Sequence, residues 1–63
     1  MQITADQLTA GMTVYRPRDG KRLNLLAEDS APRKSGRAFW AVGPRGGMEC
    51  MVVADDETVE VAA

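Results

Sequence analysis

The chain has 63 residues and a formal net charge of −1, with one cysteine and no histidine. A chain of this length forms one small domain whose stability margin is thin. A single cysteine excludes an internal disulfide, and the lack of histidine excludes the usual Cys/His zinc sites. We therefore expect one domain over residues 1–63 that uses no metal and no cofactor and depends on a hydrophobic core.

The hydropathy pattern argues against a membrane protein. No segment approaches the roughly 18 consecutive apolar residues that a membrane-spanning helix needs. The first ten residues lack the basic start and the apolar run of a secretory signal. A lone thiol is also consistent with a reducing compartment. These features predict a soluble protein of the cytoplasm.

The charges are unevenly distributed along the chain. All eight Lys and Arg residues lie between Arg16 and Arg45, and only three acidic residues share that segment. The other six acidic residues lie in the flanks. Separation of this kind can mark a basic binding face. The alternative is that the fold brings the acidic flanks against the basic middle, so that the charges offset each other.

The first ten residues predict a short helical turn. Thr4 followed by Gln7 fits a capping box, and Ile3 and Leu8 are spaced as a hydrophobic staple. Gly11 is a natural stop because glycine tolerates positive φ. We expect a single helical turn over residues 4–10 that leads into a strand.

Residues 12–16 and 22–27 predict the first two strands. In residues 12–16, Met12 and Val14 share one face and the intervening polar residues the other. Asp19-Gly20 is a strong signal for a two-residue hairpin turn. In the second strand, residues 23, 25 and 27 are expected on one face, and residues 24 and 26 on the other.

A polar loop over residues 28–36 separates the second strand from a second predicted hairpin. Its strands are residues 37–42 and 48–54, and residues 43–47 form the turn between them. The strand 48–54 is apolar on both faces except for Glu49, which favours a central position in the sheet. Cys50 lies within it and is expected to be a buried core residue.

Phe39 and Trp40 are neighbours on the third predicted strand. Successive side chains of a strand point to opposite faces, so the two rings cannot both face the core. One of them is therefore expected to be exposed or covered by the 28–36 loop. The sequence leaves open which ring that is.

The last strand, residues 58–61, follows an acidic turn and has the alternation and charge of an edge strand. Five short strands with no long helix favour a sheet that curls onto itself. The predicted fold is therefore all-β: a small, five-stranded, partly open barrel with one short N-terminal helical turn.

The stretch from Ile3 to Val14 resembles the opening of SH3-like small β-barrels, in which a hydrophobic residue, spacers and a glycine precede the first barrel strand. This resemblance implies a fold and not a function, because SH3-like barrels host many functions. The overall composition resembles short accessory proteins encoded by actinobacterial phages. That second resemblance implies a host-directed modulator that acts in a bacterial cell.

The residue types offer little catalytic chemistry. Cys50 has no histidine to activate it as a nucleophile. The acidic run of residues 55–57 lacks the spacing of a calcium loop, and residues 43–47 lack the Lys-Ser/Thr of a phosphate-binding loop. We expect a protein that is not an enzyme.

The remaining signal is a set of basic residues interleaved with aromatic ones, which can bind a phosphate backbone and stack bases or anchor a protein partner. We expect a binding module that engages an acidic host protein or nucleic acid. The alternative is a small structural or virion protein that forms homo-oligomers through Met48–Val53. The candidate partner-binding residues are Tyr15, Arg16, Arg18, Arg22, Arg33, Lys34, Arg37 and Trp40.

Overall fold

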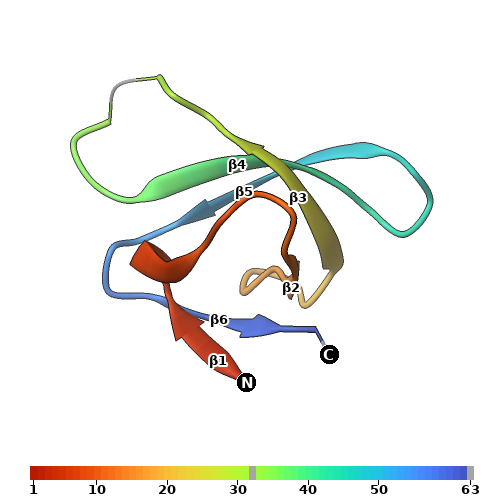
Figure 1. The fold of residues 1–63 in the computed structure, drawn as a ribbon, viewed down its shortest axis with the longest axis horizontal. Coiled ribbons are helices and arrows are strands. Elements are labelled where there is room, and N and C mark those ends of the chain that lie inside the picture. Colours follow the sequence, from red (N-terminus) through yellow and green to blue (C-terminus); the bar gives the residue numbers. More distant parts are fainter. Residues whose placement is uncertain (32, 63) are drawn as a thin grey trace.

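The computed structural model describes every residue except Pro32 and Ala63. Within the described residues, six antiparallel strands form one sheet in the order β1-β6-β2-β3-β4-β5 (Figure 1). The strands and the single 3-10 turn η1 are β1 (Gln2–Thr4), η1 (Ala5–Gln7), β2 (Thr13–Tyr15), β3 (Arg22–Glu28), β4 (Arg37–Val42), β5 (Met48–Val53) and β6 (Thr58–Val61). The prediction of an all-β fold with one N-terminal helical turn is confirmed, although the turn is shorter than predicted.

The number of strands and the closure of the sheet differ from the prediction. Five strands were expected, and β1 adds a sixth by pairing antiparallel with β6. No backbone pairing joins the two outermost strands, β1 and β5, within the described chain, so the sheet is curled but not closed into a barrel.

Alternation along the strands builds one hydrophobic core on the inner face of the sheet. Cross-strand partners share a face, so Ile3 lies beside Val59, and Val14 lies beside Leu23. Leu8, which follows η1, is fully buried, and Met12 packs against the same cluster. The buried cluster comprises Ile3, Ala5, Leu8, Val14, Leu23, Leu25, Phe39, Ala41, Met51, Val53 and Val59.

Two predictions about strand position are wrong. The strand that was expected to be central, β5, lies at one end of the sheet, and β6, which was expected at an edge, lies between β1 and β2. The unpredicted strand β1 accounts for the position of β6. The apolar residues on both faces of β5 reflect an exposed apolar outer face, and Cys50 is exposed rather than part of the core.

A β-bulge corrects the predicted facing of the end of β3. The register shifts between Leu25 and Ala27, because Leu26 is an extra residue relative to β4. Ala27 therefore pairs with Trp40 on the outer face and is exposed, instead of joining Leu25 in the core.

The turn between β2 and β3 is longer than predicted. The Arg16 N–H donates to the Lys21 carbonyl at 2.8 Å, and the Gly20 N–H donates to the Arg16 carbonyl at 2.7 Å. The loop therefore has four residues, Pro17–Gly20, rather than the two-residue Asp19-Gly20 turn. Gly20 is the only residue of this loop with positive φ. A two-residue hairpin turn needs positive φ at both of its loop residues or at the first of them.

The opposite facing of Phe39 and Trp40 is confirmed. Phe39 is buried with 1% of its surface exposed, and Trp40 is the outward ring with 48% exposed. The two aromatic residues therefore have different roles, one in packing and one on the surface.

Replacing the two rings should show this difference in stability. Phe39→Ala should lower the free energy of unfolding by about 3–5 kcal/mol, because it leaves a cavity in the core. Trp40→Ala should cost about 1 kcal/mol or less, because the indole loses only half-exposed cross-strand contacts. Urea denaturation followed by circular dichroism measures both. Equal losses would contradict the observed facing.

Candidate binding surface

The outer face of β3–β5 carries an apolar patch, here called the outer patch. Its most exposed members are Met48 at 64%, Val52 at 59%, and Trp40 and Leu26 at 48% each. The outward positions of β4 and β5 carry no charged side chain, and both strands are fully described. An exposed sheet face is normally polar, and contiguous apolar patches mark interaction sites. The outer patch consists of Leu26, Ala27, Trp40, Met48, Cys50 and Val52.

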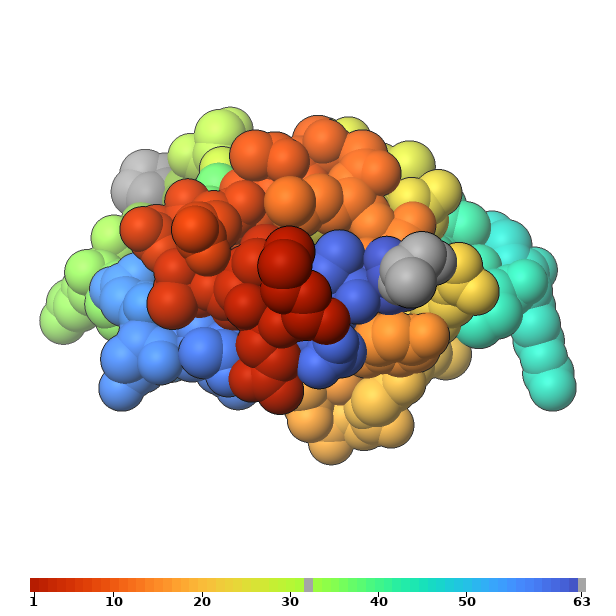
Figure 2. Space-filling view, turned by 60° about the horizontal axis from the view of Figure 1, so that its bottom comes forward, coloured from red at the N-terminus to blue at the C-terminus, as the bar shows by residue number. Residues whose placement is uncertain are grey.

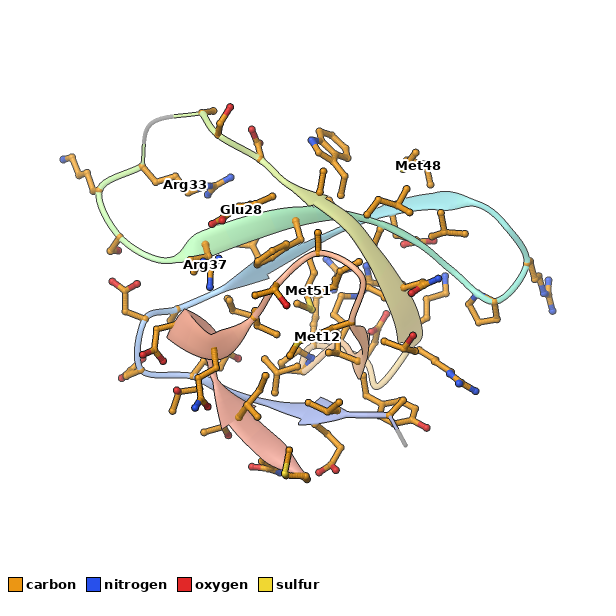
Figure 3. The ribbon with its side chains drawn as sticks, in the orientation of Figure 1. Met12, Glu28, Arg33, Arg37, Met48 and Met51 are labelled. Atoms are coloured by element: carbon orange, nitrogen blue, oxygen red, sulfur yellow. The ribbon has the colours of Figure 1, made fainter. Side chains whose placement is uncertain are left out.

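The register explains why the indole of Trp40 stays uncovered. Its cross-strand partners are Ala27 on β3 and Cys50 on β5, and both have small side chains. The bulge at Leu26 is what turns Ala27 outward. Met48 projects from the side of the sheet opposite to Met12 and Met51, which lie on the core side (Figure 3). The centre of the outer patch is therefore a large aromatic ring between two small residues.

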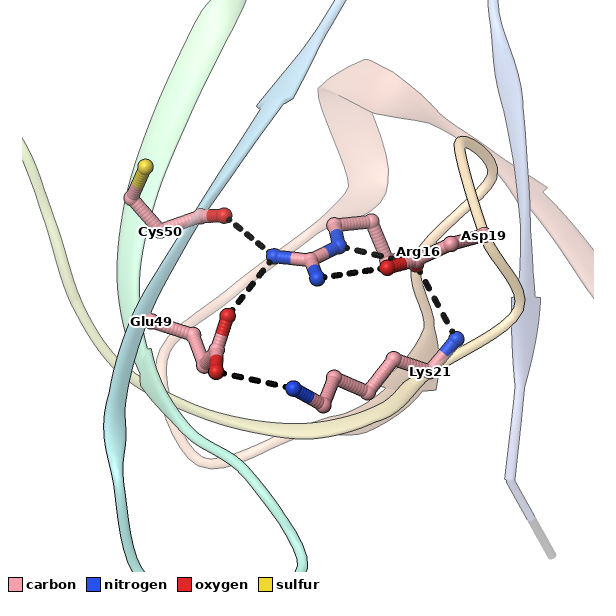
Figure 4. Close-up of polar contacts among 5 residues, drawn as sticks. All are labelled: Arg16, Asp19, Lys21, Glu49 and Cys50. Atoms are coloured by element: carbon pink, nitrogen blue, oxygen red, sulfur yellow. Dashed lines mark hydrogen bonds and ion pairs between the residues drawn. The ribbon is translucent and has the colours of Figure 1, made fainter.

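Arg16, one of the predicted surface residues, is buried, with 6% of its surface exposed. Its Nε and Nη2 atoms donate to the two carboxylate oxygens of Asp19 at 2.9 and 2.7 Å. Its Nη1 atom donates to Glu49 Oε1 at 3.1 Å and to the Cys50 carbonyl at 3.0 Å (Figure 4). Lys21 pairs with the other oxygen of Glu49 at 2.9 Å. Arg16 thus joins the Pro17–Gly20 loop to β5 and is withdrawn from the surface.

The charges in this network stabilise one another. The hydrogen bonds from Arg16, and next the backbone N–H of Lys21, hold the pKa of Asp19 well below its ordinary value. Hydrogen bonds from Lys21 and Arg16 lower the pKa of Glu49. The bond to Asp19 is in turn the largest cause of the raised pKa of Arg16. All three groups are therefore held in their charged forms.

Arg37 is also engaged inside the fold. It forms a two-pronged pair with Glu28, at 2.8 Å for both contacts, and its Nη1 atom donates to the Ala5 carbonyl at 2.7 Å. The guanidinium lies 4.9 Å from the centre of the Phe39 ring, within the range of a cation–π contact. Figure 3 shows Arg37 and Glu28 on the same side of the sheet as Met51. Arg37 therefore ties β4 to η1.

The loop after β3 carries the next two predicted residues. Arg33 lies 3.9 Å from Asp29, a loose pair, and Lys34 is exposed. Gly36 ends this loop with φ of +78°, and a Cβ atom there would lie 2.6 Å from the Val53 carbonyl oxygen. The loop can approach β5 this closely only because residue 36 has no side chain.

The remaining predicted residues lie at the other end of β3. Tyr15 is the cross-strand partner of Arg22, and both are exposed. Arg22 also lines a shallow recess of about 170 Å³ beside Asn24 and Pro44. Arg18 lies exposed in the Pro17–Gly20 loop. The eight predicted residues therefore do not form one cluster.

Residue patterns alone did not identify Leu26, Met48 and Val52 as surface residues. The available signal was the apolar character of both faces of Met48–Val53, which sequence reasoning assigned to a central strand.

A larger recess of about 360 Å³ lies beside the turn between β4 and β5. It is lined by Lys21, Gly43, Pro44, Arg45, Gly47 and Glu49. Lys21 and Glu49 are paired with each other, so the recess offers little unsatisfied charge apart from Arg45. Among residues 1–31 and 33–62, no group of three or more acidic or cysteine side chains is placed to hold a metal ion.

No family model, curated protein or solved structure matches the chain. The resemblances to SH3-like barrels and to phage accessory proteins therefore stay predictions. In the described part of the chain, the only helical element is far too short to cross a membrane.

The Arg16 network predicts that the protein loses stability in acid. Asp19 and Glu49 have lower pKa values in the folded protein than in the unfolded chain, where they are about 3.9 and 4.3. Their stabilising contribution is complete above those unfolded values and is lost as pH falls through the folded ones. We expect the free energy of unfolding to decrease below about pH 4. Urea denaturation across the acidic range measures this.

Glu49→Gln should make this acid dependence shallower, because one of the titrating partners is gone. Part of the acid dependence should remain in this variant, because Glu28, whose pKa is lowered by Arg37, is still present. Asp56→Asn is the matched control, since Asp56 is an exposed turn residue outside the ion pairs of the described chain. An unchanged slope in Glu49→Gln would contradict the role given to Glu49.

Proposed function

We propose that the protein is a non-enzymatic binding module that docks a protein partner on the outer patch. The observation that carries the proposal is the exposure of Trp40 at the centre of an uncharged apolar sheet face. Tryptophan is strongly enriched among residues that dominate binding energy, and such residues lie at the centre of an interface. Burial of the outer patch is a source of affinity that requires no catalytic group.

The charges at the ends of the outer patch indicate the kind of partner that would complement it. Arg22 begins β3, and the loop that carries Arg33 and Lys34 follows the end of the same strand. The apolar outward positions of β4 and β5 lie beside this strand. The partner is therefore an apolar segment with acidic residues at both ends. The resemblance to phage accessory proteins adds that this partner is a protein of a bacterial host.

The placement of the arginines favours a protein partner over nucleic acid. A nucleic-acid surface needs cations that track the phosphate backbone, together with aromatic rings for stacking. Arg16 and Arg37 are engaged internally, so neither is available to a phosphate backbone. The outward positions of β4 and β5 offer one aromatic ring and no cation.

Selection from a displayed random-peptide library tests the proposal directly. We expect enriched peptides with an apolar centre and acidic flanks. Trp40 is the only tryptophan, so its fluorescence reports occupancy of the outer patch. Trp40→Ala should weaken binding of a labelled peptide by about 30-fold or more, which corresponds to a hot-spot loss of about 2 kcal/mol. Arg18→Ala, an exposed residue of the Pro17–Gly20 loop, is the control and should bind as the wild type does.

Two outcomes would overturn the proposal. One is a selected peptide whose affinity is the same in Trp40→Ala as in the wild type. The other is a failure to select peptides while a single-stranded oligonucleotide quenches Trp40 with an affinity that falls steeply with salt, which would establish the nucleic-acid alternative.

A further inference from the structure

The strand β5 is an edge of the sheet that lacks most of the usual protection. Edge strands expose a row of backbone N–H and C=O groups, and proteins protect them with lysine, proline, bulges or inward-pointing charges. The outward residues of β5 are Met48, Cys50 and Val52, and its sequence contains no lysine or proline. Its single charged residue, Glu49, lies toward the inner side, where Arg16 and Lys21 bind it.

Hydrogen bonds show which backbone groups of β5 face the free edge. Arg16 donates to the Cys50 carbonyl, so that carbonyl points away from β4. In an antiparallel ladder the backbone groups alternate in direction, so those of Met48 and Val52 point the same way. The turn agrees with this phase, because the Gly47 carbonyl accepts from Gly43 on the β4 side. The free edge therefore presents the backbone groups of Met48, Cys50 and Val52.

Arg16 occupies the middle of this edge. Its guanidinium is fixed by Asp19 and Glu49 and contacts the Cys50 carbonyl (Figure 4). Lys21 reaches the same strand through Glu49, so the Pro17–Gly20 loop is joined to β5 by two cationic side chains. A strand added to β5 would need the position that the Arg16 side chain holds beside Cys50.

We propose that Arg16 guards the β5 edge and that its release allows β5 to pair antiparallel with β5 of a second copy of the chain. A register centred on Cys50 places Met48 of each copy opposite Val52 of the other, so both apolar outer faces continue across the junction. It also brings the Arg45 turn of each copy to the end where the acidic turn of residues 55–57 lies in the other. This complementarity of charge and of apolar residues identifies a second copy as the occupant.

The guard is independent of the partner proposed for the outer patch, because it concerns backbone groups on the edge rather than side chains on the face. Failure to find a peptide ligand would leave it standing. Failure of the guard would leave the binding function of the outer patch intact.

Arg16→Met tests the guard, since methionine keeps much of the side-chain length and removes every donor. We expect its mass in solution, measured by light scattering under reducing conditions, to double at concentrations where the wild type is monomeric. The backbone amides of Met48, Cys50 and Val52 should exchange with solvent at least about tenfold more slowly in the variant dimer than in the wild type. Exchange is measured by nuclear magnetic resonance.

Arg37→Met is the matched control, because the Arg37 side chain also bridges the interior but hydrogen-bonds to Glu28 and the Ala5 carbonyl and not to β5. It should lose stability and remain monomeric. If it dimerises as Arg16→Met does, destabilisation rather than edge release is the cause, and the proposal is wrong. Addition of Val52→Lys to Arg16→Met should restore the monomer, since lysine on an edge strand opposes pairing.

The exchange data separate an edge dimer from a dimer packed through the outer patch. A dimer whose Met48, Cys50 and Val52 amides exchange as fast as in the wild type would overturn the proposal. If Arg16→Met does not fold, Arg16→Lys replaces it, because an ammonium has three donors on one atom and cannot reproduce the four hydrogen bonds that the wider guanidinium makes to Asp19, Glu49 and the Cys50 carbonyl. A folded Arg16→Lys that stays monomeric with rapidly exchanging amides would count equally against the guard.

Discussion

One buried guanidinium holds this small sheet in its curled form. Strand pairing does not close the sheet, and side chains instead link elements that are not neighbours in it. Arg16, directly after β2, makes two hydrogen bonds to Asp19 in the Pro17–Gly20 loop and two to Glu49 and Cys50 of β5. Arg37 makes a second link of this kind by joining β4 to the Ala5 carbonyl of η1. A cation can be buried only when its donors are satisfied, and both arginines meet that condition with carboxylates and carbonyls.

The internal use of these arginines changes the interpretation of the charge pattern. The segment that looks basic in the sequence pairs much of its charge within the fold: Arg16 and Lys21 with Glu49, and Arg37 with Glu28. The pairs of Arg16 and Lys21 with Glu49 reach an acidic residue outside the basic segment, whereas the pair of Arg37 with Glu28 lies within it. The acidic flanks therefore offset only part of the basic charge, and some of the rest stays exposed. The surface most suited to a partner is then the uncharged outer patch.

Local features of the structure could be predicted from local patterns. Alternation placed Val14 and Leu23 in the core, and the adjacency of Phe39 and Trp40 required them to face opposite ways. Strand order could not be predicted in the same way, because it depends on contacts between distant parts of the chain. Ile3 pairs with Val59 near the opposite terminus, and no residue close to Ile3 in the sequence predicts that pairing. Glu49 alone in an apolar strand was a usable sign of a protected edge.

The candidate site was predicted only in part, for a related reason. Trp40 was included because one of the two adjacent rings had to face outward, but Met48 and Val52 were assigned to the interior along with their strand. The roles of Arg16 and Arg37 depend on which strand lies opposite each side chain. That information comes from the curl of the sheet and not from the residues beside them.

The single extra residue in β3 has a consequence for how this protein can change over evolution. Because Leu26 shifts the phase of the strand, Ala27 faces outward beneath Trp40 while Glu28 faces inward to meet Arg37. If β3 kept its length but paired with β4 without the bulge, Leu26 would pair with Trp40 and Ala27 with Phe39, and Glu28 would face outward and leave Arg37 without its acid. The exposure of Trp40 and the tie between Arg37 and η1 therefore depend on the same bulge, and a substitution that abolished the bulge at unchanged strand length would remove both.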